Sequence, residues 1–69
     1  MNKVAEQKPV AYYSEELTEI RPGLSCRVLD VDHPVLGSIK MTITSQVIDV
    51  FASGFETLNT IYLKKRQAY

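Results

Sequence analysis

Cysteine and histidine are the residue types that most readily do chemistry, and this chain has one of each, Cys26 and His33. A thiol beside an imidazole can act as a nucleophile with its base. The pattern, however, offers no third group to orient the imidazole and no oxyanion site. Cys26 also lies between Leu24 and Val28 in an alternating apolar run, where a thiol fills space as a small hydrophobe. The sequence therefore predicts a structural thiol and no enzyme.

A second candidate for chemistry is the "DVDHP" stretch, in which Asp30 and Asp32 stand beside His33. Two carboxylates and an imidazole can ligate a metal. The turn setting before Pro34 favours a simpler role, because Asp side chains accept hydrogen bonds from nearby backbone amides in turns. A structural zinc site needs four Cys or His ligands, and the chain has two. We expect no metal and no cofactor.

The chain also carries a set of hydroxyl and amide side chains at strand-like spacing: Thr42, Thr44, Ser45, Thr57, Asn59 and Thr60. Threonine on the wet face of a sheet is ordinary, and cross-strand threonine pairs stabilise sheets. The alternative is a polar floor that hydrogen-bonds a ligand or a partner backbone, with Asn59 at its centre. A ligand pocket between subunits, lined by these threonines and Lys40, stays open as a hypothesis.

Strands are the elements that must position these residues. Apolar and polar residues alternate over 24–32, 38–44, 47–51 and 55–64, the pattern of half-buried strands. The phase flips between Val28 and Leu29, which predicts a bulge or a strand covered on both faces. Residues 52–54 (Ala-Ser-Gly) predict a hairpin that pairs 47–51 with 55–59. Alternation predicts a core face of Phe55, Ile61 and Leu63, with Tyr62 on the wetter side.

The N-terminal part carries different signals. Residues 1–10 are mostly polar and predict a flexible arm, and residues 11–69 predict a single small β domain. Ser14, followed by Glu15 and Glu16, could cap a short helix that Pro22 and Gly23 would end. The expected fold is mainly β: a small curled antiparallel sheet or a partly open SH3-like barrel of about four or five strands. A short N-terminal helix, giving an α+β roll, is the alternative.

Size and composition narrow the class of protein further. The chain has 69 residues, net charge zero and 45% apolar residues, which argues against disorder. A domain this small buries only about 60% of its unfolded surface, so we expect self-association as a homodimer. The single thiol and the absence of an export signal or membrane-spanning run predict a cytoplasmic protein. Zero net charge disfavours nucleic-acid binding.

Partner-binding residues are predicted at both ends of the domain. Tyr12 and Tyr13 suit an interface anchor, because tyrosine is enriched at protein interfaces. Near the other end we predict an exposed strip that runs into a basic cluster, made of Thr57, Asn59, Tyr62, Lys64, Lys65 and Arg66. Tyrosines beside basic residues can also stack nucleic-acid bases, which keeps a nucleic-acid-binding module open.

The segments "PGLSCRVLDVDHPVLG", "TSQVIDV" and "GFETLNTIYL" resemble short uncharacterised accessory proteins of bacteriophages and prophages. The resemblance implies a compact, often dimeric protein that acts by binding a host protein, and it carries over no site residue. The function expected from the sequence is therefore a non-enzymatic small binding module. The alternatives are a nucleic-acid-binding small barrel of SH3 or KOW type and an oligomer that sequesters a nucleotide or another small ligand.

Overall fold

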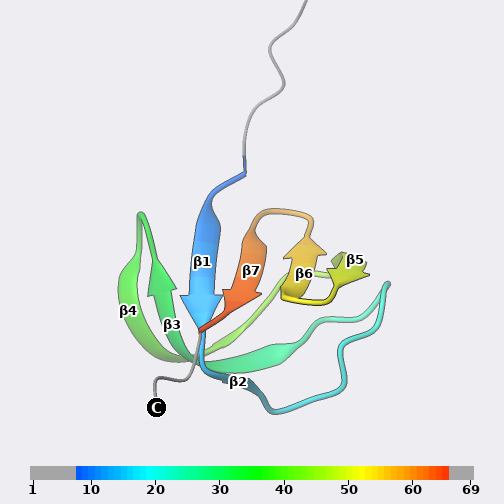
Figure 1. Ribbon diagram of the computed structural model, residues 1–69, viewed down its shortest axis with the longest axis horizontal. Helices are drawn as coiled ribbons and strands as arrows, with labels where there is room; N and C mark the ends of the chain where they lie inside the picture. The colour runs from blue at the N-terminus through cyan, green and yellow to red at the C-terminus, as the bar shows by residue number, and fades with distance from the viewer. Residues whose placement is uncertain (1–7, 66–69) are drawn as a thin grey trace, which may run out of the picture.

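The computed structural model describes residues 8–65, and all of its regular structure is β (Figure 1). There is no helix in this range. The seven strands are β1 (Val10–Tyr13), β2 (Glu15–Glu16), β3 (Arg27–His33), β4 (Gly37–Ile43), β5 (Val47–Phe51), β6 (Gly54–Thr57) and β7 (Ile61–Lys64). The prediction of a mainly β fold with a small sheet is confirmed.

The sheet consists of two antiparallel parts joined by one parallel ladder. Strand order is β2-β3-β1-β7-β6-β5, with β4 on the other side of β3. Strands β2, β3 and β4 form one part and β5, β6 and β7 the other, while β1 pairs antiparallel with β3 and parallel with β7, from Val10↔Ile61 to Tyr13↔Lys64. The sheet is antiparallel as predicted except at this one ladder, where the first and last strands run in the same direction.

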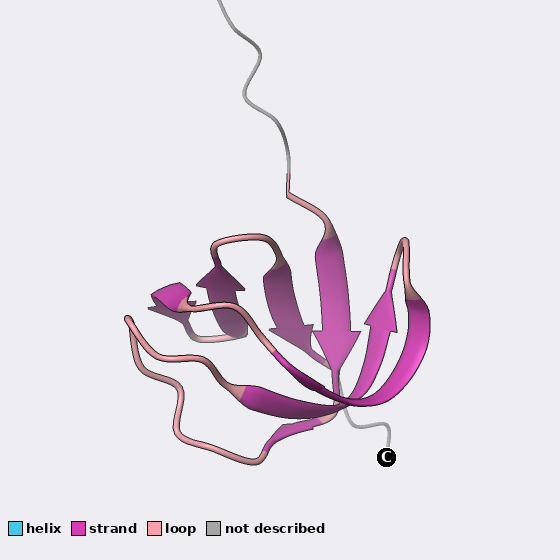
Figure 2. Cartoon of the chain, turned by 180° about the vertical axis from the view of Figure 1, so that it is seen from behind, coloured by secondary structure: helices cyan, strands magenta, loops and turns pink. Residues whose placement is uncertain are grey.

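The sheet curls strongly but does not close into a barrel, as the view from behind shows (Figure 2). Ser14, the residue between β1 and β2, meets β3 at Asp30. Asp30 has φ of 52°, a left-handed conformation that aspartate tolerates better than most residues. The Ser14 hydroxyl contacts the Leu29 carbonyl (3.2 Å) and the Asp30 carboxylate (3.0 Å). Both strands therefore bend at the same point.

The predicted helix after Ser14 is wrong. Ala11 and Tyr13 are buried and Tyr12 is exposed. Buried and exposed side chains therefore alternate, as in a strand, up to Ser14. The chain then continues along β3, with the Leu17 amide donating to the Arg27 carbonyl (2.8 Å). The Ser14 hydroxyl, which was expected to cap a helix, instead contacts Leu29 and Asp30 on the neighbouring strand. Pairing with a distant part of the chain overrides the weak local preference for a helix.

The predicted phase flip in 24–32 occurs, although its form differs from a bulge. Val28 and Val31 are both buried, three positions apart, so the inward side changes between them. The register between β3 and β4 is the same on both sides of Asp30, so no extra residue is inserted, although Asp30 and Lys40 themselves do not pair. The left-handed Asp30 rotates the strand and produces the flip.

The core is an aromatic cluster with small aliphatic residues around it. Phe55 and Tyr62 stack with ring centroids 5.1 Å apart, and Tyr13 meets them at 5.5 and 6.5 Å. Phe55 and Tyr62 are directly opposite in the β6–β7 ladder, so they share a face. The prediction that Tyr62 lies on the wetter side is wrong, because the turn at 58–60 resets the alternation. Phe55 is buried as predicted, whereas Ile61 and Leu63 are half-buried.

The end of the predicted arm is attached to the sheet where the structure describes it. The Ile61 amide donates to the Pro9 carbonyl (2.9 Å), and Lys8 Nζ lies 2.5 Å from the Glu56 carboxylate. Val10 already belongs to β1. The rest of the predicted arm, residues 1–7, lies outside the described residues.

The hairpin predicted from residues 52–54 is present and pairs β5 with β6. Gly54 is needed there because of close backbone approach: a Cβ at this position would lie 1.9 Å from the Tyr62 carbonyl oxygen and 2.9 Å from the Leu63 Cα. Both contacts are to backbone of the neighbouring strand, which cannot yield without separating β6 from β7.

We expect Gly54→Ala to destabilise the protein by about 2 kcal/mol or more, because overpacking forces strand displacement. Urea denaturation measures the loss. Gly23→Ala is the matched control: its Cβ would meet nothing within 4 Å, so only the strain of its positive φ, about 1 kcal/mol, applies. Equal losses for the two variants would contradict the close-approach explanation.

Candidate binding surface on β4 and the adjoining hollow

The structure separates Cys26 from His33, the pair whose residue types could have served as nucleophile and base. Cys26 precedes β3 and His33 ends it, and a seven-residue strand spans about 20 Å. The Cys26 thiol is buried, and burial raises its pKa, which keeps it protonated. His33 Nδ1 accepts hydrogen bonds from the Val35 and Leu36 amides (both 3.1 Å) and thereby caps the β3–β4 turn. The imidazole therefore performs the turn role that the sequence assigned to aspartate.

The two aspartates of the same stretch are held by other side chains. Asp32 pairs with Lys65 Nζ (3.0 Å) and accepts from the Ser38 hydroxyl (3.1 Å); hydrogen bonding to Lys65 and then to Ser38 lowers the pKa of this carboxyl. Asp30 accepts from Ser14. Within residues 8–65 no three metal-ligating side chains gather.

Several of the predicted partner-binding residues are buried in the folded chain. Tyr13, Thr57 and Tyr62 are buried, so the prediction of a continuous exposed strip is wrong for Thr57 and Tyr62. Tyr12 and Asn59 are exposed and remain predictions. Arg66 lies outside the described residues.

The two described lysines of the predicted basic cluster form ion pairs within the chain. Lys64 Nζ lies 3.4 Å from the Glu16 carboxylate, and Lys65 pairs with Asp32. Positive charge at this end of β7 is therefore balanced by neighbouring carboxylates, and the lysines stabilise the junction of β1, β3 and β7. Their role as partner-binding residues remains a prediction.

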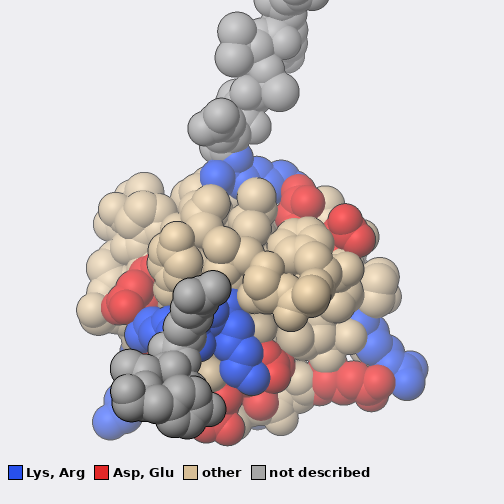
Figure 3. Space-filling view, in the orientation of Figure 1, with Lys and Arg blue, Asp and Glu red and all other residues tan. Residues whose placement is uncertain are grey.

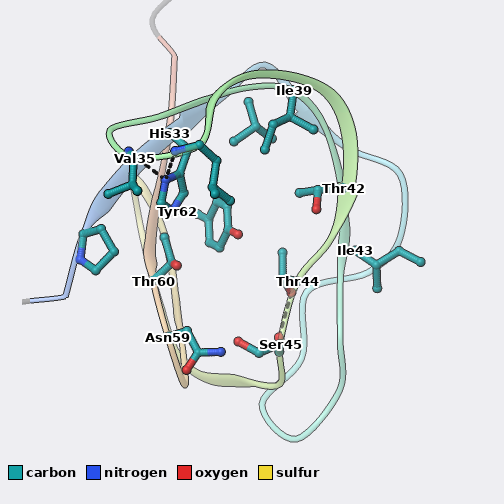
Figure 4. Close-up of a pocket in the computed structure, with 13 residues that line it drawn as sticks. His33, Val35, Ile39, Thr42, Ile43, Thr44, Ser45, Asn59, Thr60 and Tyr62 are labelled. Carbon is teal, nitrogen blue, oxygen red and sulfur yellow. Dashed lines mark hydrogen bonds between the residues drawn. The ribbon is translucent and has the colours of Figure 1, made fainter.

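Strand β4 carries an inverted pattern of polarity. Met41 and Ile43 are exposed, whereas Thr44 is buried and Thr42 half-buried. In the close-up Thr42 points to the inside of the curl and Ile43 away from it (Figure 4). A curled sheet ordinarily places apolar side chains on its concave face. Here the second half of β4 presents the Thr42 hydroxyl inward and the apolar side chains of Met41 and Ile43 outward, whereas Ile39 in the first half is half-buried and packs against the core. Val35 and Leu36 of the preceding turn are exposed.

The outer edge of β4 has no neighbouring strand within the described part of the chain, since β4 pairs with β3 only. The Thr44 amide donates to the Cys26 carbonyl (2.8 Å) across the ladder. Because backbone groups in an antiparallel ladder alternate between the two sides, Thr42, which pairs with Val28, also bonds toward β3. The amides and carbonyls of Met41 and Ile43 therefore point outward.

The opposite edge of the sheet, β5, is protected. Its register shifts between Val47 and Asp49, and bulges of this kind discourage edge pairing. The Val47 amide donates to the Leu24 carbonyl (2.9 Å), and the Asp49 carboxylate accepts from the Val50 amide (2.9 Å). Of the two edges, β4 is the one open to an added strand.

A hollow of about 430 Å³ lies on the concave side of β4 (Figure 4). The apolar part of its wall comes from Pro9, Val31, Val35, Leu36, Ile39 and Ile43, and the polar part from His33, Thr42, Thr44, Ser45, Asn59, Thr60 and Tyr62. These described lining residues include no Asp, Glu, Lys or Arg. Burial raises the pKa of Tyr62, although the hydrogen bond with Thr60 opposes the shift, so the phenol stays protonated at neutral pH.

The predicted polar floor is therefore assembled in large part by the fold. The hollow brings together five of the six predicted residues; Thr57 is excluded, and Lys40 instead borders a separate depression beside Lys65. Thr44 has a structural task, because its hydroxyl donates to the Ser45 carbonyl (2.7 Å) and accepts from the Cys26 amide (3.0 Å). The sequence did not reveal the wall contributed by Pro9 and Tyr62, which only nonlocal pairing brings there.

Comparison with protein-family models, with curated proteins and with solved structures finds no match to this chain. Over residues 8–65 no helix has the length and hydropathy needed to cross a membrane. The function proposed below therefore rests on the β4 edge and the adjoining hollow.

Thr57 holds the turn that forms the floor of the hollow. Its hydroxyl donates to the Thr60 carbonyl (3.0 Å) and accepts from the Thr60 amide (3.1 Å). We expect Thr57→Val, which keeps the shape, to cost about 1–3 kcal/mol in urea denaturation, because buried polar groups lose their partner. Thr42→Val, in the hollow, is the control, expected within about 0.5 kcal/mol of the parent. A Thr57→Val variant as stable as this control would contradict the assignment.

Glu16 makes the stability of the fold depend on pH. Burial alone would raise its pKa, but hydrogen bonding with Tyr13 and the charge of Lys64 outweigh burial and lower the pKa below the ordinary 4.5. The stabilisation is present above 4.5 and is lost as the pH falls through the lower folded-state value. We expect Glu16→Gln to flatten the fall in urea midpoint between about pH 5 and pH 3. The exposed Glu15→Gln is the control; an unchanged slope for Glu16→Gln would refute the assignment.

Proposed function

We propose that this protein is a non-enzymatic binding module that captures an extended segment of a partner protein along the outer edge of β4. The observation that carries the proposal is the combination on one strand of outward backbone groups at Met41 and Ile43 with exposed apolar side chains at the same two residues. An extended peptide that adds to a sheet edge gains main-chain hydrogen bonds and side-chain contacts together.

The charge of the surface supports a protein partner over nucleic acid. In the space-filling view, basic and acidic side chains lie next to one another instead of forming a region of one sign (Figure 3). Lys64 and Lys65, the described members of the predicted basic cluster, are ion-paired. A nucleic-acid surface would need positive charge that is not already neutralised.

The resemblance to phage accessory proteins, together with the single thiol, makes a host protein in the cytoplasm the partner that we propose. Self-association through the same edge is the competing occupant. Two copies of β4 would place Lys40, the sole charge on the strand, near its counterpart, which is unfavourable. A partner strand with a carboxylate opposite Lys40 avoids this repulsion.

The proposal is tested with Met41→Pro. Proline at this position removes an outward amide without removing a β3–β4 hydrogen bond, and edge positions tolerate it. We expect quantitative pull-down from host lysate to recover a specific partner with the parent protein and to lose it, by about tenfold or more, with Met41→Pro. Protection of the Met41 and Ile43 amides from hydrogen exchange in the complex must accompany recovery.

Met41→Thr is the matched control, because it removes the apolar side chain and keeps the amide. It should weaken recovery less than proline does. Equal recovery by the parent and Met41→Pro would overturn the proposal. Sedimentation equilibrium of the same variants separates the occupants: a parent dimer that Met41→Pro converts to a monomer would assign the edge to a second copy instead.

A further inference from the structure

The hollow beside β4 has the position and chemistry of a specificity pocket for the captured segment. We infer that it receives one aromatic side chain with a polar tip, a tyrosine, from the partner residue directly opposite Thr42. This inference rests on the proposed edge pairing and adds to it the identity and register of the recognised side chain.

The register follows from strand geometry. Residues directly opposite in a ladder point to the same face of the sheet, and Thr42 points into the hollow (Figure 4). The outward backbone groups belong to Met41 and Ile43, so a strand added antiparallel makes a non-hydrogen-bonded pair at Thr42, the closer kind of pair. The partner residue at this position therefore projects over the concave side, while its two neighbours lie against Met41 and Ile43.

The chemistry of the hollow selects the side chain. Its wall includes the apolar side chains of Val35, Leu36 and Ile39 and the polar side chains of Ser45, Asn59 and Thr60. In Figure 4 Val35 and Ile39 form the upper wall, and Ser45 and Asn59 lie at the lower end. A ring buries apolar area against the upper wall, and a phenol hydroxyl reaches the polar groups below. The described lining residues carry no carboxylate, ammonium or guanidinium to pair with a charged group, so a charged side chain would lose its hydration without compensation.

The flanking positions complete the recognised pattern. Opposite Met41 and Ile43 the partner needs β-branched apolar residues, which pack on the exposed outer face. Opposite Lys40 it needs a carboxylate, since Lys40 is the one charge on β4. Read antiparallel to β4, the pattern is apolar, tyrosine, apolar, acidic.

A synthetic peptide of this pattern tests the inference: acetyl-Thr-Val-Tyr-Val-Glu-Thr-Ser-amide, titrated into the ¹⁵N-labelled parent protein. We expect amide shifts at Met41 and Ile43, and nuclear Overhauser contacts from the peptide ring to the Thr60 methyl. The peptide with alanine in place of tyrosine should bind about tenfold more weakly at the same edge, and the phenylalanine peptide should fall between the two.

Two results overturn different claims. Equal affinities of the tyrosine and alanine peptides, with β4 amides shifted by both, overturn the specificity pocket and leave edge pairing standing. No β4 shift with any peptide overturns edge pairing, and the pocket with it. The variant Thr42→Phe, which fills the hollow from within, checks the pocket independently: it should abolish the difference between the peptides while the edge amides still respond.

Discussion

The parallel ladder between β1 and β7 is the constraint on which the rest of the molecule depends. The two antiparallel parts of the sheet meet through it, and the aromatic core straddles it, with Tyr13 supplied from β1 and Phe55 and Tyr62 from β6 and β7. The ion pairs of Lys64 and Lys65 close over the end of the same ladder. The hollow has opposite walls only because this ladder sets β4 and the Thr57–Thr60 turn on facing sides of the curl.

Local signals in the sequence predicted local structure well. The hairpin of β5 and β6 could be predicted because its turn residues and both its strands are neighbours in the chain, and β4 because its alternation is regular. The parallel ladder could not be predicted from local sequence patterns, because the residues that pair in it are about fifty positions apart along the sequence. The errors follow from this: Ser14 was assigned to a helix because its partners Leu29 and Asp30 are distant, and Tyr62 was assigned to the wet face because the tight turn after Thr57 resets the phase.

Only part of the candidate site could be predicted from the sequence. The hydroxyl set around Asn59 was recognisable as a group, and the fold gathers most of it. The alternation over 38–44 and the usual place of threonine on a wet face suggested an outward Thr42, yet the twist beside Asp30 turns Thr42 inward and Met41 and Ile43 outward. Such conflicts between the local pattern and the global arrangement concentrate where a protein interacts. The contrast between the two sheet edges strengthens this interpretation, because β5 carries a register shift and its Val47 backbone is bonded to the 23–24 loop, whereas no described residue pairs with the outer edge of β4.

The pairing of the first strand with the last also governs how the chain reaches this structure. Loop closure over most of the chain must precede the central ladder, so folding is slow for a protein of this size. During synthesis the β3–β4 hairpin can form early, but β1 has no parallel neighbour until β7 has left the ribosome. The nascent chain therefore displays the open edge of β4 before the core exists, and the lysine in the middle of that strand is the feature that limits premature association at this stage.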